Sequence, residues 1–333
     1  MHKTGIFVIS LDFELHWGGF EKWPLDLYVD YFLNTRKVIL EMLDIFQSNN
    51  IHATWATVGL LMHKNKAELL NNLPTIKPTY ALSYLSAYDY IEKTGIGDSE
   101  EMDPFHYAFS LIQQIKKIKG QEIGTHTFSH YYCNEMGQQP NQFHSDIMAA
   151  KVAAKSLNVY FESLVFPRNQ YNPEYLKICA EEGIKIVRTN PLDWWWQIDS
   201  AHNESKWKRL NRGMDAYFSI GGKTSYKIES LKQTMGVILL PASRLLRPYN
   251  PKELFLNNLK IKRIKKEMSL AALNKEVYHL WWHPHNFGHF PKNNLDGLVE
   301  IVEHAKTLSD EYGMKSLNMG EIAYLFNNEI SEN

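Results

Sequence analysis

The sequence predicts an α/β protein whose fold is a closed or nearly closed (β/α) barrel of seven strands. Short apolar runs, typical of buried strands, alternate along the chain with longer segments in which apolar residues recur every three or four positions, as at Val38, Met42, Ile45 and Phe46. Seven such runs in one chain favour a closed or nearly closed parallel barrel over two small domains. Polar residues also follow several of the runs directly, which is typical of a barrel that carries a site at one rim.

The expected elements follow one another in a regular order. Strands are expected at residues 6–14, 53–58, 122–125, 163–166, 185–188, 237–240 and 277–282. Helices are expected at residues 31–48, 105–119, 142–157, 173–182, 251–273 and 295–312. This alternation of strands with helices predicts a parallel sheet.

We expect residues 1–333 to form a single barrel domain with two insertions, at about residues 60–104 and 194–235. Both segments are too long for simple connections between a strand and the next helix. Long connections in compact domains are usually lids or binding loops. We therefore expect both insertions to cover the mouth of the barrel and to select the substrate.

Composition excludes several classes of protein. The chain has 333 residues, 44% of them hydrophobic, and can bury a large core. Its formal net charge is −1, and we interpret its densest basic run, residues 260–266, as the solvated face of a helix, so nucleic acid is not an expected partner. The two cysteines, Cys133 and Cys179, provide neither a disulfide framework nor a cysteine zinc site. A strand is expected directly after residues 1–4, and no apolar run approaches 18 residues, so we expect a cytoplasmic protein without a membrane span.

The most informative residues lie at the ends of the expected strands, where a parallel α/β barrel places its reacting groups. Asp12 and Glu14 end the first strand, two residues apart and therefore on the same side of it. His126 and His130 follow the third strand. On an extended strand they would lie about 13 Å apart, whereas in one helical turn they come within about 6 Å and can share a metal ion. The later strands are followed by Arg168, Asp193 and the pair His283 and His285.

This ordered set resembles the polysaccharide deacetylase family, also described as the NodB homology domain or carbohydrate esterase family 4. That family has an acid pair on the first strand, a His-(Ser/Thr)-x-x-His motif, an Arg-Pro element, an Asp-Trp element and a late Leu-x-His motif. The corresponding segments here are Asp12/Glu14, His126–His130, Phe166–Arg168, Asp193-Trp194 and Leu280–His283. They span about residues 6–290. Here the third element reads Pro-Arg in place of Arg-x-Pro, and the last contains an additional Trp.

The resemblance implies a distorted (β/α) barrel and a divalent metal, most often zinc, bound by one acid and both histidines. The separated acids resemble the branch of the family in which the second acid is the ligand, which implies Glu14, His126 and His130 as ligands. Three ligands with an open position for water are the arrangement of catalytic zinc. Asp12 is then expected as general base and His283 as the acid that protonates the leaving group. Arg168 is expected to keep Asp12 ionised, and Asp193 to orient His283.

Trp194 and Trp282 are the expected substrate-binding aromatics, because indole rings suit the apolar C–H faces of sugars. The function expected is removal of an N-acetyl, N-formyl or O-acetyl group from a sugar or saccharide conjugate by a metal-dependent hydrolase. A catalytically inactive carbohydrate-binding protein on the same barrel is a second reading. A non-haem iron oxygenase is a third, because two histidines and a carboxylate also form a facial triad. His285 remains an alternative to His283 as the acid.

Overall fold

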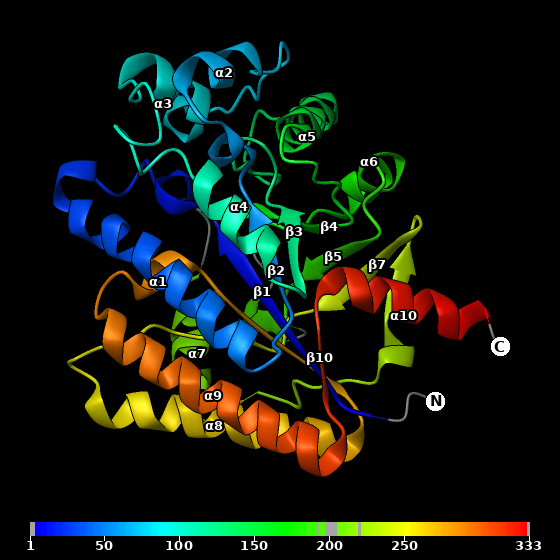
Figure 1. Cartoon of the computed structure of the whole chain (residues 1–333). Helices are drawn as coiled ribbons and strands as arrows, with labels where there is room; N and C mark the ends of the chain where they lie inside the picture. Colours follow the sequence, from blue (N-terminus) through cyan, green and yellow to red (C-terminus); the bar gives the residue numbers. More distant parts are fainter. Residues whose placement is uncertain (1–3, 192, 197–204, 219–220, 332–333) are drawn as a thin grey trace.

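The computed structural model describes residues 4–191, 193–196, 205–218 and 221–331. Its centre is a ten-stranded, mostly parallel sheet (Figure 1). The strands are β1 (Ile6–Phe13), β2 (Ala53–Thr57), β3 (Gln121–Thr125), β4 (Ser163–Val165), β5 (Ile186–Thr189), β6 (Lys232–Thr234), β7 (Val237–Pro241), β8 (Arg244–Leu245), β9 (Val277–Trp282) and β10 (Lys315–Leu317). Their order in the sheet is β6-β7-β5-β4-β3-β2-β1-β9-β8, with β10 paired to β1. All seven predicted strands are confirmed, as β1 to β5, β7 and β9.

The sheet curls so that one stretch of chain reaches both of its sides. β7 pairs with β5, and β8, which begins three residues after β7 ends, pairs with β9. The amide of Ala242 donates to the carbonyl of Thr189 on β5 (2.9 Å), and the amide of Ser243 donates to the carbonyl of His279 on β9 (2.8 Å). The chain between β7 and β8 therefore connects the two sides of the sheet, although no ladder joins β8 to β6 within the described residues.

Helices surround this sheet, with α1, α9 and α8 side by side in Figure 1. The helices are α1 (Val29–Ser48), α2 (Lys66–Asn71), α3 (Ala87–Lys93), α4 (Phe109–Lys117), α5 (Pro140–Lys155), α6 (Leu176–Glu181), α7 (Lys206–Asp215), α8 (Leu254–Asn274), α9 (Pro291–Tyr312) and α10 (Met319–Ser331). The six predicted helices correspond to α1, α4, α5, α6, α8 and α9. Among the described residues, no helix combines the length and apolar character that a bilayer span requires.

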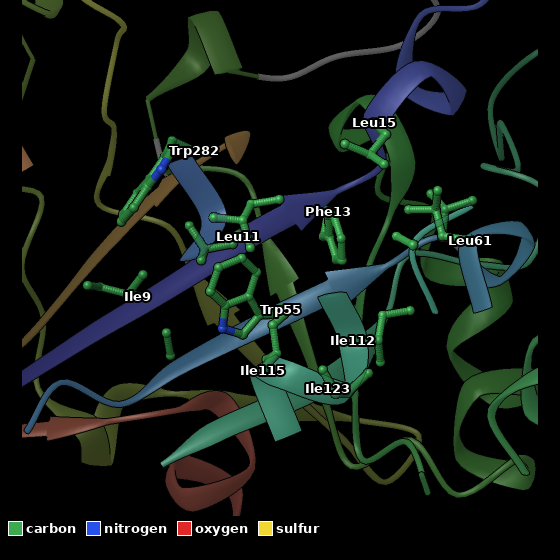
Figure 2. Close-up of a cluster of buried hydrophobic side chains, with 14 of the residues drawn as sticks. Ile9, Leu11, Phe13, Leu15, Trp55, Leu61, Ile112, Ile115, Ile123 and Trp282 are labelled. Atoms are coloured by element: carbon green, nitrogen blue, oxygen red, sulfur yellow. The ribbon is translucent and has the colours of Figure 1, made fainter. Parts of the chain in front are cut away.

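The alternation of side chains along β1 separates the core from the site. Ile9, Leu11 and Phe13 point to one face, where they pack with Trp55 of β2 and with α4, as Figure 2 shows. Side chains of neighbouring strand residues point to opposite faces, so Ser10 and Asp12 point to the other side, toward the barrel interior. Every residue of β1 is buried, which explains its nearly continuous apolar sequence.

The basic run at residues 260–266 is only partly solvated, contrary to expectation. Lys260 and Arg263 are buried in α8. The guanidinium of Arg263 donates to the carboxylates of Glu267 (3.0 Å) and Asp215 (3.1 Å), and Arg244 donates to the same two carboxylates (2.7 and 3.2 Å). Two arginines and two acids thus neutralise one another, so the basic residues of α8 include structural members of a buried network.

Candidate active site

Glu14 lies directly after β1, at the residue that precedes a short 3₁₀ helix, η1 (Leu15–Gly18). Its carboxylate is buried, and burial alone would raise its pKa. The facing His283 and His130 more than offset this effect, so the pKa of Glu14 lies well below its usual value. Gly18 allows this position, because a Cβ there would lie 2.0 Å from Glu14 Oε1.

His126 and His130 are brought together by a bent loop after β3, and not by the helical turn that their spacing suggested. Two residues of the loop, Thr127 (φ 63°) and His130 (φ 58°), adopt the left-handed conformation, which reverses the chain. Asp146 of α5 stabilises the loop by accepting hydrogen bonds from the amides of Phe128 (2.6 Å) and Ser129 (3.2 Å). The two imidazole rings lie with their centroids 5.1 Å apart.

Glu14, His126 and His130 form a candidate metal site, because one ligand atom from each lies within 4.8 Å of the other two. Glu14 Oε2 is 3.2 Å from His126 Nε2 and 3.0 Å from His130 Nε2. Among the described residues the buried Nε2 of His126 has no hydrogen-bond partner, which fits a nitrogen reserved for a cation. One carboxylate and two imidazoles are a donor set that suits zinc, so the residues present fit the expected ion.

The second nitrogen of each histidine is held by a neighbouring group. His126 Nδ1–H donates to the carbonyl of Val165 (2.8 Å), which leaves the Nε2 lone pair toward Glu14. His130 Nδ1 lies 3.1 Å from the hydroxyl of Tyr132. Burial lowers the pKa of His130 despite the nearby Glu14, and this favours the neutral form that metal binding requires. Such partners orient metal-binding histidines and fix the proton on the remote nitrogen.

Asp12 is paired with Arg188 of β5, and not with Arg168 as the sequence suggested. Arg188 donates to both carboxylate oxygens, at 2.6 and 2.8 Å. Arg168 instead forms an ion pair with Glu21 and lies over the ring of Tyr132, 4.2 Å from its centroid. The reason for the exchange is geometric: Arg168 follows β4 with a left-handed backbone (φ 54°), whereas Arg188 lies within β5. Burial alone would raise the pKa of Asp12. The charges of Arg188 and of the nearby histidines lower it by more, so the pKa of Asp12 lies below its usual value.

His283 faces both acids from the opposite side. Its Nε2 lies 3.5 Å from Asp12 Oδ2 and 3.7 Å from Glu14 Oε1. His285 also faces Glu14, with Nδ1 at 3.7 Å, but it is buried, and burial lowers its pKa to about 3. The side chain of His283 retains 25% exposure, so of the two it is the one that solvent and a substrate can reach.

Asp193 does not contact His283. Its carboxylate accepts a long hydrogen bond from the amide of Gly222 (3.5 Å), whereas Nδ1 of His283 lies 3.4 Å from the side-chain amide of Asn286. Asn286 belongs to the short helix η9 (Pro284–Phe287) that immediately follows His283. The partner of this histidine is therefore local, and the assignment of Asp193 as its orienting residue is wrong.

Trp282 is a core residue, which corrects its assignment to substrate binding. It is fully buried and stacks on Phe287, with ring centroids 6.0 Å apart, and Figure 2 shows it within the apolar cluster. Its neighbour Trp281 points to the opposite face of β9, where Arg188 lies over its ring (4.3 Å) and His283 lies 5.6 Å away. Trp194 is 52% exposed and packs edge-on to Trp195.

The first insertion contacts the segment that follows Glu14. His16 and His106 are buried and share a hydrogen bond (2.9 Å), and His106 Nδ1 lies 2.8 Å from the carboxylate of Asp103. The other nitrogen of His16 donates to the carbonyl of Trp23 (2.8 Å). Tyr90 of α3 also packs against His16, with ring centroids 5.7 Å apart, so part of the 60–104 insertion lies against the loop after β1. Residues 197–204 and 219–220 of the second insertion lie outside the described residues.

Arg188, Gly18 and Asp146 are the residues near the site that sequence reasoning missed. A charged residue inside the apolar strand run at residues 185–188 was a usable signal, because a buried arginine requires an acidic partner. Gly18 and Asp146 gave no comparable signal. Their importance depends on one close approach and on one helix-to-loop contact between distant parts of the chain.

Solved structures of similar fold support the same class of architecture. A protein from Mycobacterium smegmatis described as a polysaccharide deacetylase matches with a TM-score of 0.61 and 14% identity, over 99% of this chain and 92% of that one. One from Pseudomonas aeruginosa with the same description matches with a TM-score of 0.55 and 11% identity, over 97% and 90%. A 4-alpha-glucanotransferase from Thermococcus litoralis matches with a TM-score of 0.55 and 14% identity, over 97% of this chain but 40% of that one.

No family model and no curated protein sequence matches the chain. At these identities the structural likeness concerns the fold. The chain is an α/β protein with the fold of the polysaccharide deacetylases, which confirms the fold expected from the sequence.

Proposed function

We propose that this protein is a metal-dependent hydrolase that removes an N-acetyl, N-formyl or O-acetyl group from a sugar. The observation that carries the proposal is the surroundings of the Glu14 carboxylate. One of its oxygens faces His126 and His130, and the other faces His283, beside the Asp12–Arg188 pair. The candidate cation site and the candidate acid–base pair therefore meet at one buried carboxylate.

A divalent cation bound by Glu14, His126 and His130 would acidify a water molecule and polarise the acyl carbonyl. Asp12 would serve as the general base toward the attacking water, because its lowered pKa keeps it ionised. The Arg188 pair fixes both of its oxygens and thereby its orientation. His283 is placed to donate a proton to the departing amine or alcohol from the other side.

The substrate we propose is an acylated saccharide precursor of a surface polysaccharide, carried on a nucleotide or on a lipid. Trp194 is the aromatic side chain best placed to stack on it, because it is exposed, whereas Trp281 beside His283 is buried under Arg188. The two insertions are proposed to select among such substrates. Trp196, in the second insertion, contacts Trp281 edge-on (6.2 Å).

The inactive binding protein and the iron oxygenase remain the competing functions. The same three ligands suit a facial triad, whereas the pairing of Asp12 with Arg188 opposite His283 favours hydrolysis. The discriminating experiment measures metal content and screens acylated amino sugars, free and carrier-linked, for acetate or formate release by the zinc-loaded protein. We expect release that His126→Ala abolishes. Tight saccharide binding without release would support the inactive protein, and activity that requires iron and oxygen would support the oxygenase.

A further inference from the structure

The helix α7 (Lys206–Asp215) has an unusual orientation, because its apolar side faces solvent. Trp207, Leu210 and Met214 are spaced by three and four residues and so share one side of the helix. They are 70%, 48% and 39% exposed, and Phe218, just beyond the helix, is 54% exposed. Surface helices normally turn such a side toward the core.

This orientation is fixed by buried ionic contacts at the end of the helix. The backbone carbonyl of Asp215 accepts hydrogen bonds from Arg244 (2.8 Å) and Arg263, and its carboxylate binds both arginines. Arg212, one turn earlier, donates to the carbonyl of Trp195 (2.9 Å) and lies over the ring of Trp196 (5.3 Å). The polar side of α7 is therefore the one attached to the protein, and the apolar side cannot turn inward without breaking these contacts.

Charge indicates which partner covers the apolar side. Around Trp207, from Lys206 to Arg209, the sequence contains two lysines and one arginine and no acidic residue, in a chain whose net charge is −1. Lys206 is exposed beside Trp207. A short helix with exposed Trp, Leu and Met and with basic neighbours is the pattern of helices that lie in the interface of an anionic membrane. A second copy of the chain fits less well, because a two-fold contact would bring the same cations face to face.

We propose that α7 and Phe218 dock this protein on the surface of an anionic lipid membrane. The helix that carries the docking side is connected to the candidate active site, through contacts from Arg212 on its inner side to Trp196, from Trp196 to Trp281, and from Trp281 to His283. A docked molecule would therefore bring the site to the membrane surface. If the proposed hydrolase function holds, this docking favours a lipid-linked saccharide over a nucleotide-linked one as substrate.

The test is sedimentation of the full-length protein with vesicles of phosphatidylcholine, with and without phosphatidylglycerol. We expect binding that requires phosphatidylglycerol and weakens with added salt. Trp207→Ala should lower the partition coefficient about tenfold, because a large apolar side chain no longer leaves water. Lys206→Gln should lower it less. Tyr324→Ala is the matched control, since Tyr324 on α10 is an equally exposed aromatic (73%), and its binding should be unchanged.

Vesicle binding does not depend on catalysis, so this test is independent of the proposed reaction. Retention of the melting temperature by Trp207→Ala will show that the variant is folded. The docking proposal is overturned by the absence of binding, by equal binding to both kinds of vesicle, or by a dimer in light scattering that Trp207→Ala dissociates.

Discussion

Arg188 and Asp12 form a buried, two-pronged ion pair that connects β5 to β1 across the barrel. Nη1 and Nη2 of the arginine lie 2.6 and 2.8 Å from the two carboxylate oxygens. Nη1 also donates to the hydroxyl of Ser10 (3.1 Å), which lies 2.8 Å from Nε2 of His279. Ser10 of β1, supported by His279 of β9, thus holds the arginine in place. The arginine in turn fixes the orientation of the carboxylate proposed as general base.

Replacing this arginine should change the pH dependence of catalysis. Burial raises the pKa of Asp12 and Arg188 lowers it. Arg188→Met removes the charge that offsets burial, and the pKa of Asp12 should rise. Because Asp12 must be ionised to accept a proton, we expect the acidic limb of kcat/KM to move to higher pH. Arg188→Lys, which keeps the charge but loses the two-pronged geometry, should give a smaller shift.

Arg168→Met is the control for this series. Arg168 forms an ion pair with Glu21 and not with Asp12. The acidic limb of kcat/KM in the Arg168→Met variant should therefore stay close to that of the unmodified protein. Equal shifts in the Arg168 and Arg188 variants would show that general loss of positive charge, and not the pair with Asp12, sets the limb.

His283 and His285 differ in the solvent exposure of their side chains. His283 retains 25% exposure, whereas burial lowers the pKa of His285 to about 3 and keeps it neutral near pH 7. We expect His283→Ala to lower the rate about 10²- to 10⁴-fold for an amide substrate, because the amine must be protonated as it leaves. The loss should be much smaller for an activated aryl acetate, whose leaving group needs no proton. The measurement is the ratio of the two rates, in this variant and in His285→Ala.

A large amide-specific loss in His285→Ala, with none in His283→Ala, would exchange the two assignments. Equal losses on both substrates in His283→Ala would indicate a structural role for that residue.

Apolar patterning was sufficient to predict the strands, but not the direction of individual side chains at their ends. The seven runs were recognisable because strands buried on both faces are apolar throughout, as in residues 6–13. Trp282 was assigned to the substrate site although it faces the core, because a shift of one residue exchanges the two faces of a strand and the sequence does not show which face is which. The partner of Asp12 was missed because Arg168 is nearer to the family motif, whereas Arg188 is nearer in space. The position of α7 depends on buried ion pairs with α8 and β8, which no local pattern encodes.

Asp146 should make stability depend on pH in a direction opposite to that of most acids. Burial raises its pKa from 3.8 to about 6, despite its hydrogen bonds from Ser129, Phe128 and Tyr88. The folded state therefore binds its proton more tightly than the unfolded state does. This contribution to stability is fully present below about pH 4 and is lost as pH rises through about 6. A rise in pKa from 3.8 to about 6 corresponds to roughly 3 kcal/mol.

The measurement compares urea unfolding of the unmodified protein and of Asp146→Asn between pH 4 and 7, since other titrating groups cancel in the difference. The unmodified protein should lose stability relative to the variant as pH rises. A relative gain would mean that the hydrogen bonds from the loop outweigh burial and that the pKa of Asp146 is lowered.

The last prediction separates the proposed base from the proposed ligand. Asp12 and Glu14 are chemically similar, but Asp12 is engaged by Arg188, whereas Glu14 Oε2 faces His126 and His130. Asp12→Asn keeps the shape and removes the base, so we expect a rate loss of about 10²- to 10⁴-fold with nearly unchanged zinc content. Glu14→Gln should instead weaken zinc binding, because an amide oxygen is a poorer ligand for a dication than a carboxylate. Zinc content and deacylation rate are measured for both variants on one substrate. Loss of zinc from the Asp12 variant, with retention in the Glu14 variant, would reverse the two roles, and full activity in both would remove this strand end from the mechanism.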